Sequence, residues 1–420
     1  MRFSAVLLRQ HIGFHFKKHW IVQGKRVPSD TGAQAELVAR GIPVVDPNEL
    51  ISERRVVDPS QRVQVVGQLP PEVQLDENHP LYKREQCYLY GDRNVLLEGV
   101  RQAQVLLNTV VYDELPLRVE ERLDKMKIPT PLDRSMQQSV LAALVFDTEQ
   151  VKTALVKDPE RPAFKFPRVY GISNEKRNRL ILSKLVTHCE RFLGPEVSSN
   201  RKIIANTQFI VPVIKDLDRI QFSLKVDSFI TSTAPIKPLD NSVYRPQDQS
   251  LPDIHPVKET VTIPTTHFYE WQNEYPISRQ YRFSHPHTVL LHCSPDSVAN
   301  MFETPVTDDQ KEARAMIKAF TVAAARARQL YGEDVQALPA PINVQVVQTD
   351  SQWFHFGIFQ LNTLDLKVEE GGQSSQSRNL WFRKPRMDLY SECGYRVGKP
   401  ALVDYNREVL RHMAVFYGSS

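Results

Sequence analysis

The stretch TDDQKEARAMIKAFTVAAARARQLYG (residues 307–332) contains the clearest element that the sequence predicts. Thr307 is a favourable N-cap residue, and Gln310 stands three positions later, where its side chain completes a capping box. Gly332 directly follows the helical pattern, and glycine is common just beyond helix C-termini. The sequence therefore predicts a helix between Thr307 and Gly332.

This helix has two contrasting faces at 100° per residue. Its apolar face, which we expect to meet a core, carries Ala313, Met316, Ile317, Phe320, Ala324 and Ala327. Its opposite face is basic and carries Lys311, Arg314, Lys318, Arg326 and Arg328. The pattern leaves two possibilities open for the basic face, which are contact with phosphates and contact with water.

Two strand-like segments, INVQVVQ (342–348) and TDSQWFHFGIFQLNTLDL (349–366), follow the helix and predict an antiparallel hairpin packed against it. Pleating places His355 among large apolar side chains, and five residues of strand separate it by about 16 Å from Asp350. We therefore expect a buried, hydrogen-bonded histidine and no catalytic role. Asn362 and Asp365 are expected to shape the exit turn.

The remaining segments complete an α+β fold, with packed helices and a mixed, largely antiparallel sheet. Helical periodicity predicts helices in residues 94–110, 135–156 and 175–194. Strands are expected in residues 202–214 and 219–229, which can pair as a hairpin, and in residues 287–293. The proline-rich residues 231–264 are expected to form a long surface excursion. These segments divide the core into a mainly helical part (81–200) and an α+β part (201–420).

An extended N-terminal arm is expected to precede this core. Residues 30–80 form the predicted arm, and the seven prolines of residues 27–80 argue against any helix there. A disordered linker is the alternative for this stretch. Residues 1–29 contain six Lys or Arg and no acid, with apolar residues interspersed, which is typical of a mitochondrial presequence. An ordinary basic tail is the alternative there.

Charge and motifs exclude several classes of function. The formal net charge of the chain is +4, so residues 30–420 carry −2 once the six cations of residues 1–29 are removed. Nucleic-acid binding by the core must therefore come from local patches. The sequence has no GxGxxG, Walker, HExxH or GxSxG motif, and its four cysteines are far apart. We accordingly expect no catalytic residues, no cofactor and no disulfide framework.

One string, HPHTVLLH (285–292), resembles a metal site in composition. His285 and His287 share a strand face, whereas His292 has the opposite parity and no acidic residue stands in the string. A histidine cluster at the rim of a sheet is the favoured interpretation. The alternative is a metal-dependent RNA-processing enzyme that uses these three histidines.

Three stretches interleave basic and aromatic residues, which is the composition of surfaces that bind unpaired RNA. They are RPAFKFPRVYGISNEKRNR (161–179), YPISRQYRF (275–283) and RNLWFRKPR (378–386). Solvated charge is the alternative for each. Together with the helix 307–332 they supply the candidate RNA contacts: Arg161, Lys165, Arg168, Lys176, Arg177, Arg179, Arg279, Arg282, Lys311, Arg314, Lys318, Arg328, Arg383, Lys384 and Arg386.

Four segments together resemble one known family: HPLYKREQCYLY (79–90), LLEGVRQA (96–103), ARQLYGEDVQAL (327–338) and residues 349–366. These are similar to the mitochondrial large-subunit ribosomal protein thirty-seven family. The ending QLNTLDL is also similar to that family's paralogue of the programmed-cell-death type. The resemblance runs in patches from His79 to the C-terminus.

The resemblance implies a structural subunit of the mitochondrial ribosome in the matrix, supporting mitochondrial translation. Its implied partners are large-subunit rRNA, neighbouring ribosomal proteins and the paralogous subunit, with no membrane span and no small-molecule substrate. A protein-only matrix adaptor is a further alternative. The near-neutral core favours a peripheral position in which protein contacts do much of the holding.

Overall fold

The computed structural model describes residues 31–46, 49, 77, 79–145, 151–152, 170–257, 263–294, 298, 300, 304–367 and 377–420. The chain divides into two units, Met1–Gln74 and Leu75–Ser420. The predicted presequence (1–29) lies outside the described residues, and so does most of the predicted arm.

The first unit contains one described helix, α2 (Ala33–Ala39). It lies between Pro28 and Pro43, and no proline interrupts the fourteen residues between them. Its sequence, AQAELVA, consists mostly of good helix formers. The expectation that prolines exclude every helix from residues 27–80 is therefore wrong for this stretch. The helix buries none of its side chains.

A nine-stranded sheet dominates the described part of the second unit, with the order β2-β11-β10-β9-β8-β6-β1-β7 and β5 added along β6. Its strands are β1 (Tyr82–Gly91), β2 (Thr109–Tyr112), β5 (Arg201–Lys215), β6 (Asp218–Ser232), β7 (Thr265–Phe268), β8 (His285–His292), β9 (Ala337–Thr349), β10 (Trp353–Thr363) and β11 (Asn379–Asp388). Three neighbouring pairs are parallel, namely β1 with β6, β8 with β9 and β2 with β11. The remaining pairs are antiparallel, so the predicted mixed, largely antiparallel α+β fold is confirmed.

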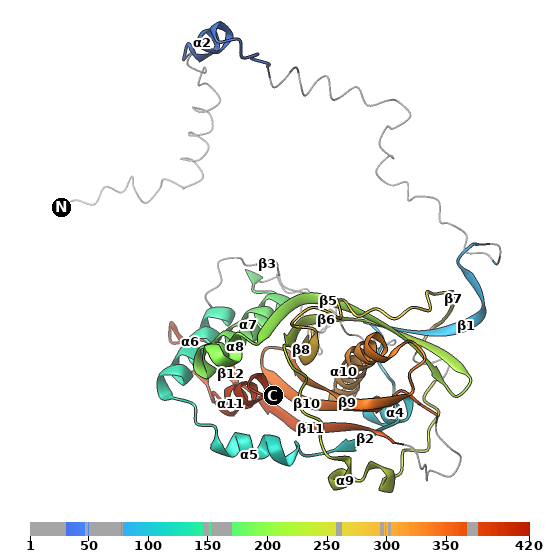
Figure 1. The fold of residues 1–420 in the computed structure, drawn as a ribbon. Helices are drawn as coiled ribbons and strands as arrows, with labels where there is room; N and C mark the ends of the chain where they lie inside the picture. Colours follow the sequence, from blue (N-terminus) through green and yellow to red (C-terminus); the bar gives the residue numbers. More distant parts are fainter. Residues whose placement is uncertain are drawn as a thin grey trace, which may run out of the picture. The chain divides into compact units, whose positions relative to one another are not determined.

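Helices cover both faces of this sheet (Figure 1). The long helix α10 (Asp308–Tyr331) and α4 (Gly99–Leu106) share one hydrophobic cluster with the concave face. The opposite face forms a second cluster with α5 (Leu117–Lys125), α6 (Thr130–Leu144), α7 (Asn174–Leu193) and α11 (Glu408–Tyr417). All of β10 is buried because it lies between the two layers.

The strongest local patterns are found as predicted. Helix α10 begins with the Thr307–Gln310 capping box and ends before Gly332. Helix α7 ends at Gly194, whose φ of 78° suits glycine. Strands β5 and β6 form the expected hairpin, with Lys215 opposite Asp218, and β9 and β10 form the other.

Weaker patterns were extended too far. The helix predicted for residues 135–156 ends at Leu144, and Val151–Lys152 form a short strand (β3) paired with β4 (Tyr170–Gly171). The helix predicted for 94–110 occupies only Gly99–Leu106. Strands β1 and β2 lie in the range predicted to be mainly helical, and they belong to the main sheet.

Short elements complete the described core. They are α8 (Pro195–Ser198), α9 (Asn241–Tyr244), the 3₁₀ turn η2 (Pro246–Asp248) and the hairpin of β12 (Glu392–Arg396) and β13 (Lys399–Val403). Helix α9 and η2 lie within the stretch predicted to be a surface excursion. That stretch also contributes a buried side chain, Ile236, so part of it packs into the fold.

Candidate functional site

The basic face of α10 is enclosed, because the sheet curves around the helix (Figure 1). Arg314 is buried and Lys318 is only 1% exposed. Their side-chain nitrogens lie 3.5 and 2.6 Å from Asp92, which follows β1. The Lys318 ammonium also donates to the carbonyl of Lys225. The expectation of an open basic face on this helix is therefore wrong.

Burial and ion pairing shift the pKa values of this group in linked ways. Burial lowers the pKa of Lys318 to about 8, with Arg314 acting in the same direction and Asp92 opposing. Burial also disfavours ionised Asp92, but Lys318 and Arg314 outweigh that effect and lower the pKa of the carboxyl group. The three side chains thus hold one another in the interior.

The C-terminal end of α10 is anchored in a similar way. Arg326 is buried, donates to the Ser284 hydroxyl at 2.9 Å and lies over the ring of Tyr275 at 5.4 Å. Arg328 lies 3.8 Å from Glu333. These contacts give both arginines structural roles in the folded chain.

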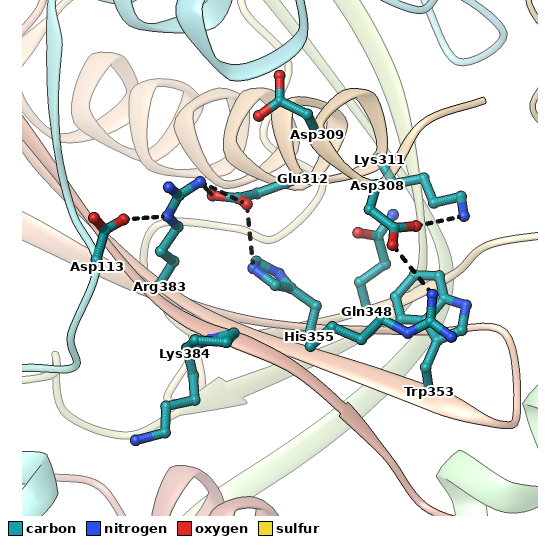
Figure 2. A pocket seen from close by; sticks show the side chains of 12 residues that line it. Asp113, Asp308, Asp309, Lys311, Glu312, Gln348, Trp353, His355, Arg383 and Lys384 are labelled. Carbon is teal, nitrogen blue, oxygen red and sulfur yellow. Dashed lines mark hydrogen bonds and ion pairs between the residues drawn. The ribbon is translucent and has the colours of Figure 1, made fainter. Parts of the chain in front are cut away.

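A polar cluster surrounds Glu312 in the N-terminal half of α10 (Figure 2). Its carboxylate accepts a hydrogen bond from the Trp381 indole at 3.0 Å and is bridged by Arg383 at 3.0 and 3.1 Å. Arg383 also donates to Asp113 at 2.7 Å. Burial raises the pKa of Glu312, although Trp381 and Arg383 oppose it by stabilising the charged form.

His355 points toward this cluster from β10 without a hydrogen bond to it (Figure 2). Its Nε2 lies 3.7 Å from the Glu312 carboxylate, beyond hydrogen-bond range. His355 is buried, as predicted. The predicted hydrogen bond is absent, because neither ring nitrogen has a partner among the described residues. Burial, aided by Arg383, lowers the pKa of His355 to about 4, which leaves the ring neutral at pH 7.

The three histidines of β8 have separate surroundings. His287 is buried between the Thr288 hydroxyl at 2.8 Å and the Ser419 carbonyl at 3.0 Å. His292 lies 3.8 Å from Asp227, and His285 is half-buried. Within the described ranges no three His, Cys, Asp or Glu side chains are grouped as metal ligands. The geometry therefore gives no support to the metal-enzyme alternative.

The predicted rRNA contacts fall into distinct groups. Arg161, Lys165 and Arg168 lie outside the described residues. Arg179, Arg279 and Arg282 are exposed, whereas Lys176 and Arg177 are half-buried. Four more have acidic partners: Lys311 and Arg386 pair with Asp308, Lys384 pairs with Glu120 and Arg383 pairs with Glu312 and Asp113. The last three, Arg314, Lys318 and Arg328, form the ion pairs of α10 described above.

The segment before β8 carries two of the exposed cations, Arg279 and Arg282. The guanidinium of Arg282 lies 5.5 Å from the centre of the Phe283 ring, and Tyr281 is 43% exposed beside it. No ion pair to Arg279 or Arg282 occurs among the residues that the structure describes. A stacked arginine next to an exposed tyrosine is suited to phosphate and base contact.

Comparison with known proteins is consistent with a ribosomal class. Residues 296–419 match the family described as Mitochondrial 28S ribosomal protein S30 (PDCD9). Large ribosomal subunit protein mL37 of Bos taurus is 29% identical over 300 residues, which is 70% of this chain and 65% of the relative. The Gallus gallus protein of the same name is 28% identical over 321 residues, or 76% of this chain and 68% of the relative.

These matches show that the chain is similar to mitochondrial ribosomal proteins. Within that class the relatives just described carry the name mL37, so the resemblance drawn from the sequence is confirmed. The match spans just under two thirds of the bovine relative's own length. Among the described residues, no helix is long and apolar enough to cross a membrane.

Proposed function

We propose that this chain is a structural constituent of the large subunit of the mitochondrial ribosome, located in the matrix and without a catalytic site of its own. The observation that carries the proposal is the similarity to proteins named large ribosomal subunit protein mL37 in several vertebrates. Two features of the fold support it. The α+β core contains internally paired charges, and it carries exposed cations, among them Arg279 and Arg282.

Large-subunit rRNA is the proposed nucleic-acid partner, and the segment of Arg279, Tyr281, Arg282 and Phe283 is the proposed primary contact. Both arginines are exposed, so they can bind a phosphate without breaking an ion pair within the protein. Arg179 is the proposed secondary contact. The ion-paired Lys311, Arg383, Lys384 and Arg386 would have to exchange a carboxylate for a phosphate, and the buried Arg314 and Lys318 contribute to the fold instead.

Other mitochondrial ribosomal proteins, including the paralogous subunit, are the proposed protein partners. Because residues 30–420 carry a net charge of −2, attraction to rRNA phosphates alone should bind the chain weakly. We therefore expect contacts with proteins to contribute much of the binding free energy.

Gradient sedimentation of lysed mitochondria tests the proposal. The chain should co-sediment with the large subunit at low salt and be loosened at high salt. The double variant Arg279→Glu and Arg282→Glu should be released at a lower salt concentration than the native chain. Lys399→Glu, which reverses an exposed charge on β13, is the matched control and should behave as the native chain.

Two results would contradict the proposal or redirect it. Migration at the top of the gradient at low salt would sink the ribosomal role. Co-sedimentation without any rRNA crosslink from residues 161–179, 275–283 or 311–328 would favour the protein-only adaptor.

A further inference from the structure

A cavity of about 340 Å³ lies between the N-terminal half of α10 and the ends of β9, β10 and β11 (Figure 2). This volume falls in the ordinary range of small-ligand pockets. Gln348 of β9 and His355 of β10 line it and are direct cross-strand neighbours. Their side chains therefore lie on the same face of the sheet, the face that α10 covers.

Both side chains carry polar atoms without partners. Gln348 is 0% exposed, yet neither its amide oxygen nor its amide nitrogen is hydrogen-bonded among the described residues. The two ring nitrogens of His355 are in the same condition. A buried polar group left in this state costs about 1–3 kcal/mol, so such groups mark sites where a ligand or ordered water completes the structure.

The charges around the cavity favour an uncharged occupant. Four acids line it, Asp113, Asp308, Asp309 and Glu312, as do four bases, Lys311, Arg383, Lys384 and Arg386. Each base already lies within ion-pair distance of a carboxylate. A charged group inside would have to displace one of these partners, whereas a neutral polar group would not.

The hydrogen-bonding groups of Gln348 and His355 indicate which neutral ligands the cavity can bind. The Gln348 amide presents one acceptor beside one donor, and the neutral imidazole of His355 presents another of each. A side-chain amide of this kind pairs with the adjacent donor and acceptor on the edge of a nucleobase. At the mouth of the cavity the Arg386 side chain is 45% exposed and pairs with the exposed carboxylates of Asp308 and Asp388, which a phosphate could replace.

From these contacts we infer that the cavity binds a single unpaired nucleobase, read by Gln348 and His355, with the attached phosphate at the mouth near Arg386. This inference rests on the proposed rRNA-binding function and gives it a specific base-binding pocket. The occupant is an extruded nucleotide of an RNA chain, and the base is held by its edge within the cavity.

Isothermal titration of the purified full-length chain with the four nucleoside 5′-monophosphates tests the inference. At least one should bind saturably, while ribose 5-phosphate, which has no base, should not. Gln348→Leu should weaken that binding at least tenfold. It should also leave the protein as stable as before or more so, because it removes an unpaired buried amide. The exposed Gln208→Leu on β5 is the control and should change neither property.

A measurement on assembled particles keeps the test sharp if free nucleotides bind weakly. In large subunits carrying Gln348→Leu, base-specific chemical probes should modify one unpaired rRNA nucleotide severalfold more than in native subunits. If no monophosphate binds and no nucleotide gains reactivity, the cavity is a water-filled gap and the inference is wrong. Co-sedimentation of the chain with the large subunit in that same experiment would leave the proposed function standing.

Discussion

At the scale of single residues, the site around Glu312 depends on a position without a side chain. Gly357 of β10 lies under the indole of Trp381, and a Cβ at Gly357 would come within 2.2 Å of that ring. The missing side chain lets Trp381 lie flat enough to donate its N–H to Glu312. A buried carboxylate on α10 is thus stabilised by a tryptophan for which a glycine makes room.

Gly357→Ala should consequently destabilise the fold by about 1–3 kcal/mol, since a buried ring must move to accept the methyl group. The free energy of unfolding from urea titration measures the effect. Gly394→Ala on β12 is the matched control, because nothing lies within 4 Å of its Cβ position. Equal stability of the two variants would show that Trp381 is not tightly held.

His355 should make stability depend on pH in a defined direction. Its pKa is about 4 in the folded chain against an ordinary value near 6.5, so the unfolded chain binds more protons between these values. The stability that depends on His355 being neutral is therefore fully present above pH 6.5 and is lost as the pH falls toward 4. Between pH 7 and pH 4.5 the native chain should lose roughly 2–3 kcal/mol more stability than His355→Gln.

Urea titration of both proteins at the two pH values provides the measurement. Glu312, Arg383 and Asp308 act on the ring of His355 in the native chain, so the comparison measures the titration of His355 together with its coupling to these groups. The same loss in the native chain and the variant would mean that His355 is accessible to protons in the folded state.

At the scale of elements, the sequence predicted what its local patterns contain. The capping box, the final glycine and the apolar face of α10 are all local features, and all were found. The basic face was misjudged because its partners lie elsewhere in the chain: Asp92 follows β1, and Ser284 precedes β8. A helical wheel shows which side chains share a face, but it does not show that a curved sheet covers that face.

The candidate cavity was missed for the same reason. Gln348 was only one polar residue in a strand pattern, although Gln345 and Gln348 both interrupt the apolar run VQVVQ and were the available signal. His355 was recognised as buried, but the lack of a hydrogen-bond partner could not be foreseen. Both facts depend on the register of β9 and β10 and on the position of α10 above them.

The capping box of α10 should contribute measurably to the whole fold. The Thr307 hydroxyl accepts a hydrogen bond from the backbone N–H of Gln310 at 3.3 Å. The side-chain oxygen of Gln310 accepts one from the backbone N–H of Thr307 at 3.1 Å. Thr307→Ala should lower the free energy of unfolding by about 1 kcal/mol. Thr187→Ala, at an exposed position inside α7, should change it by less than about 0.5 kcal/mol. Identical effects would show that the cap adds nothing beyond propensity.

At the scale of the molecule, the cations buried around α10 hold the fold. Arg314 and Lys318 on α10, together with Arg383 on β11, have carboxylate partners. A phosphate could reach these three cations only by displacing a carboxylate. The proposed RNA contacts are therefore made by local groups of exposed cations.

We expect stability to depend on the second unit, Leu75–Ser420, and not on the first. Among the described residues, those of both hydrophobic clusters fall within Leu75–Ser420, and α2 buries no side chain. A chain that begins at Leu75 should therefore unfold at the same urea concentration as the full chain. Removal of residues 408–420 is the matched control, since α11 places Leu410, Met413 and Phe416 in the second cluster. Each buried side chain of this size contributes about 2 kcal/mol, so the loss of the helix should exceed the margin of a typical domain.

Sedimentation of the chain that begins at Leu75 then tests whether residues 1–74 serve assembly. If residues 1–74 serve assembly, the chain from Leu75 should fold normally yet join the large subunit less completely than the full chain, because contacts of the arm with its surroundings are missing. A drop in its unfolding midpoint would show instead that the first unit stabilises the second. Normal folding with undiminished co-sedimentation would remove the arm from the proposed mode of binding and leave the core patches to account for all of it.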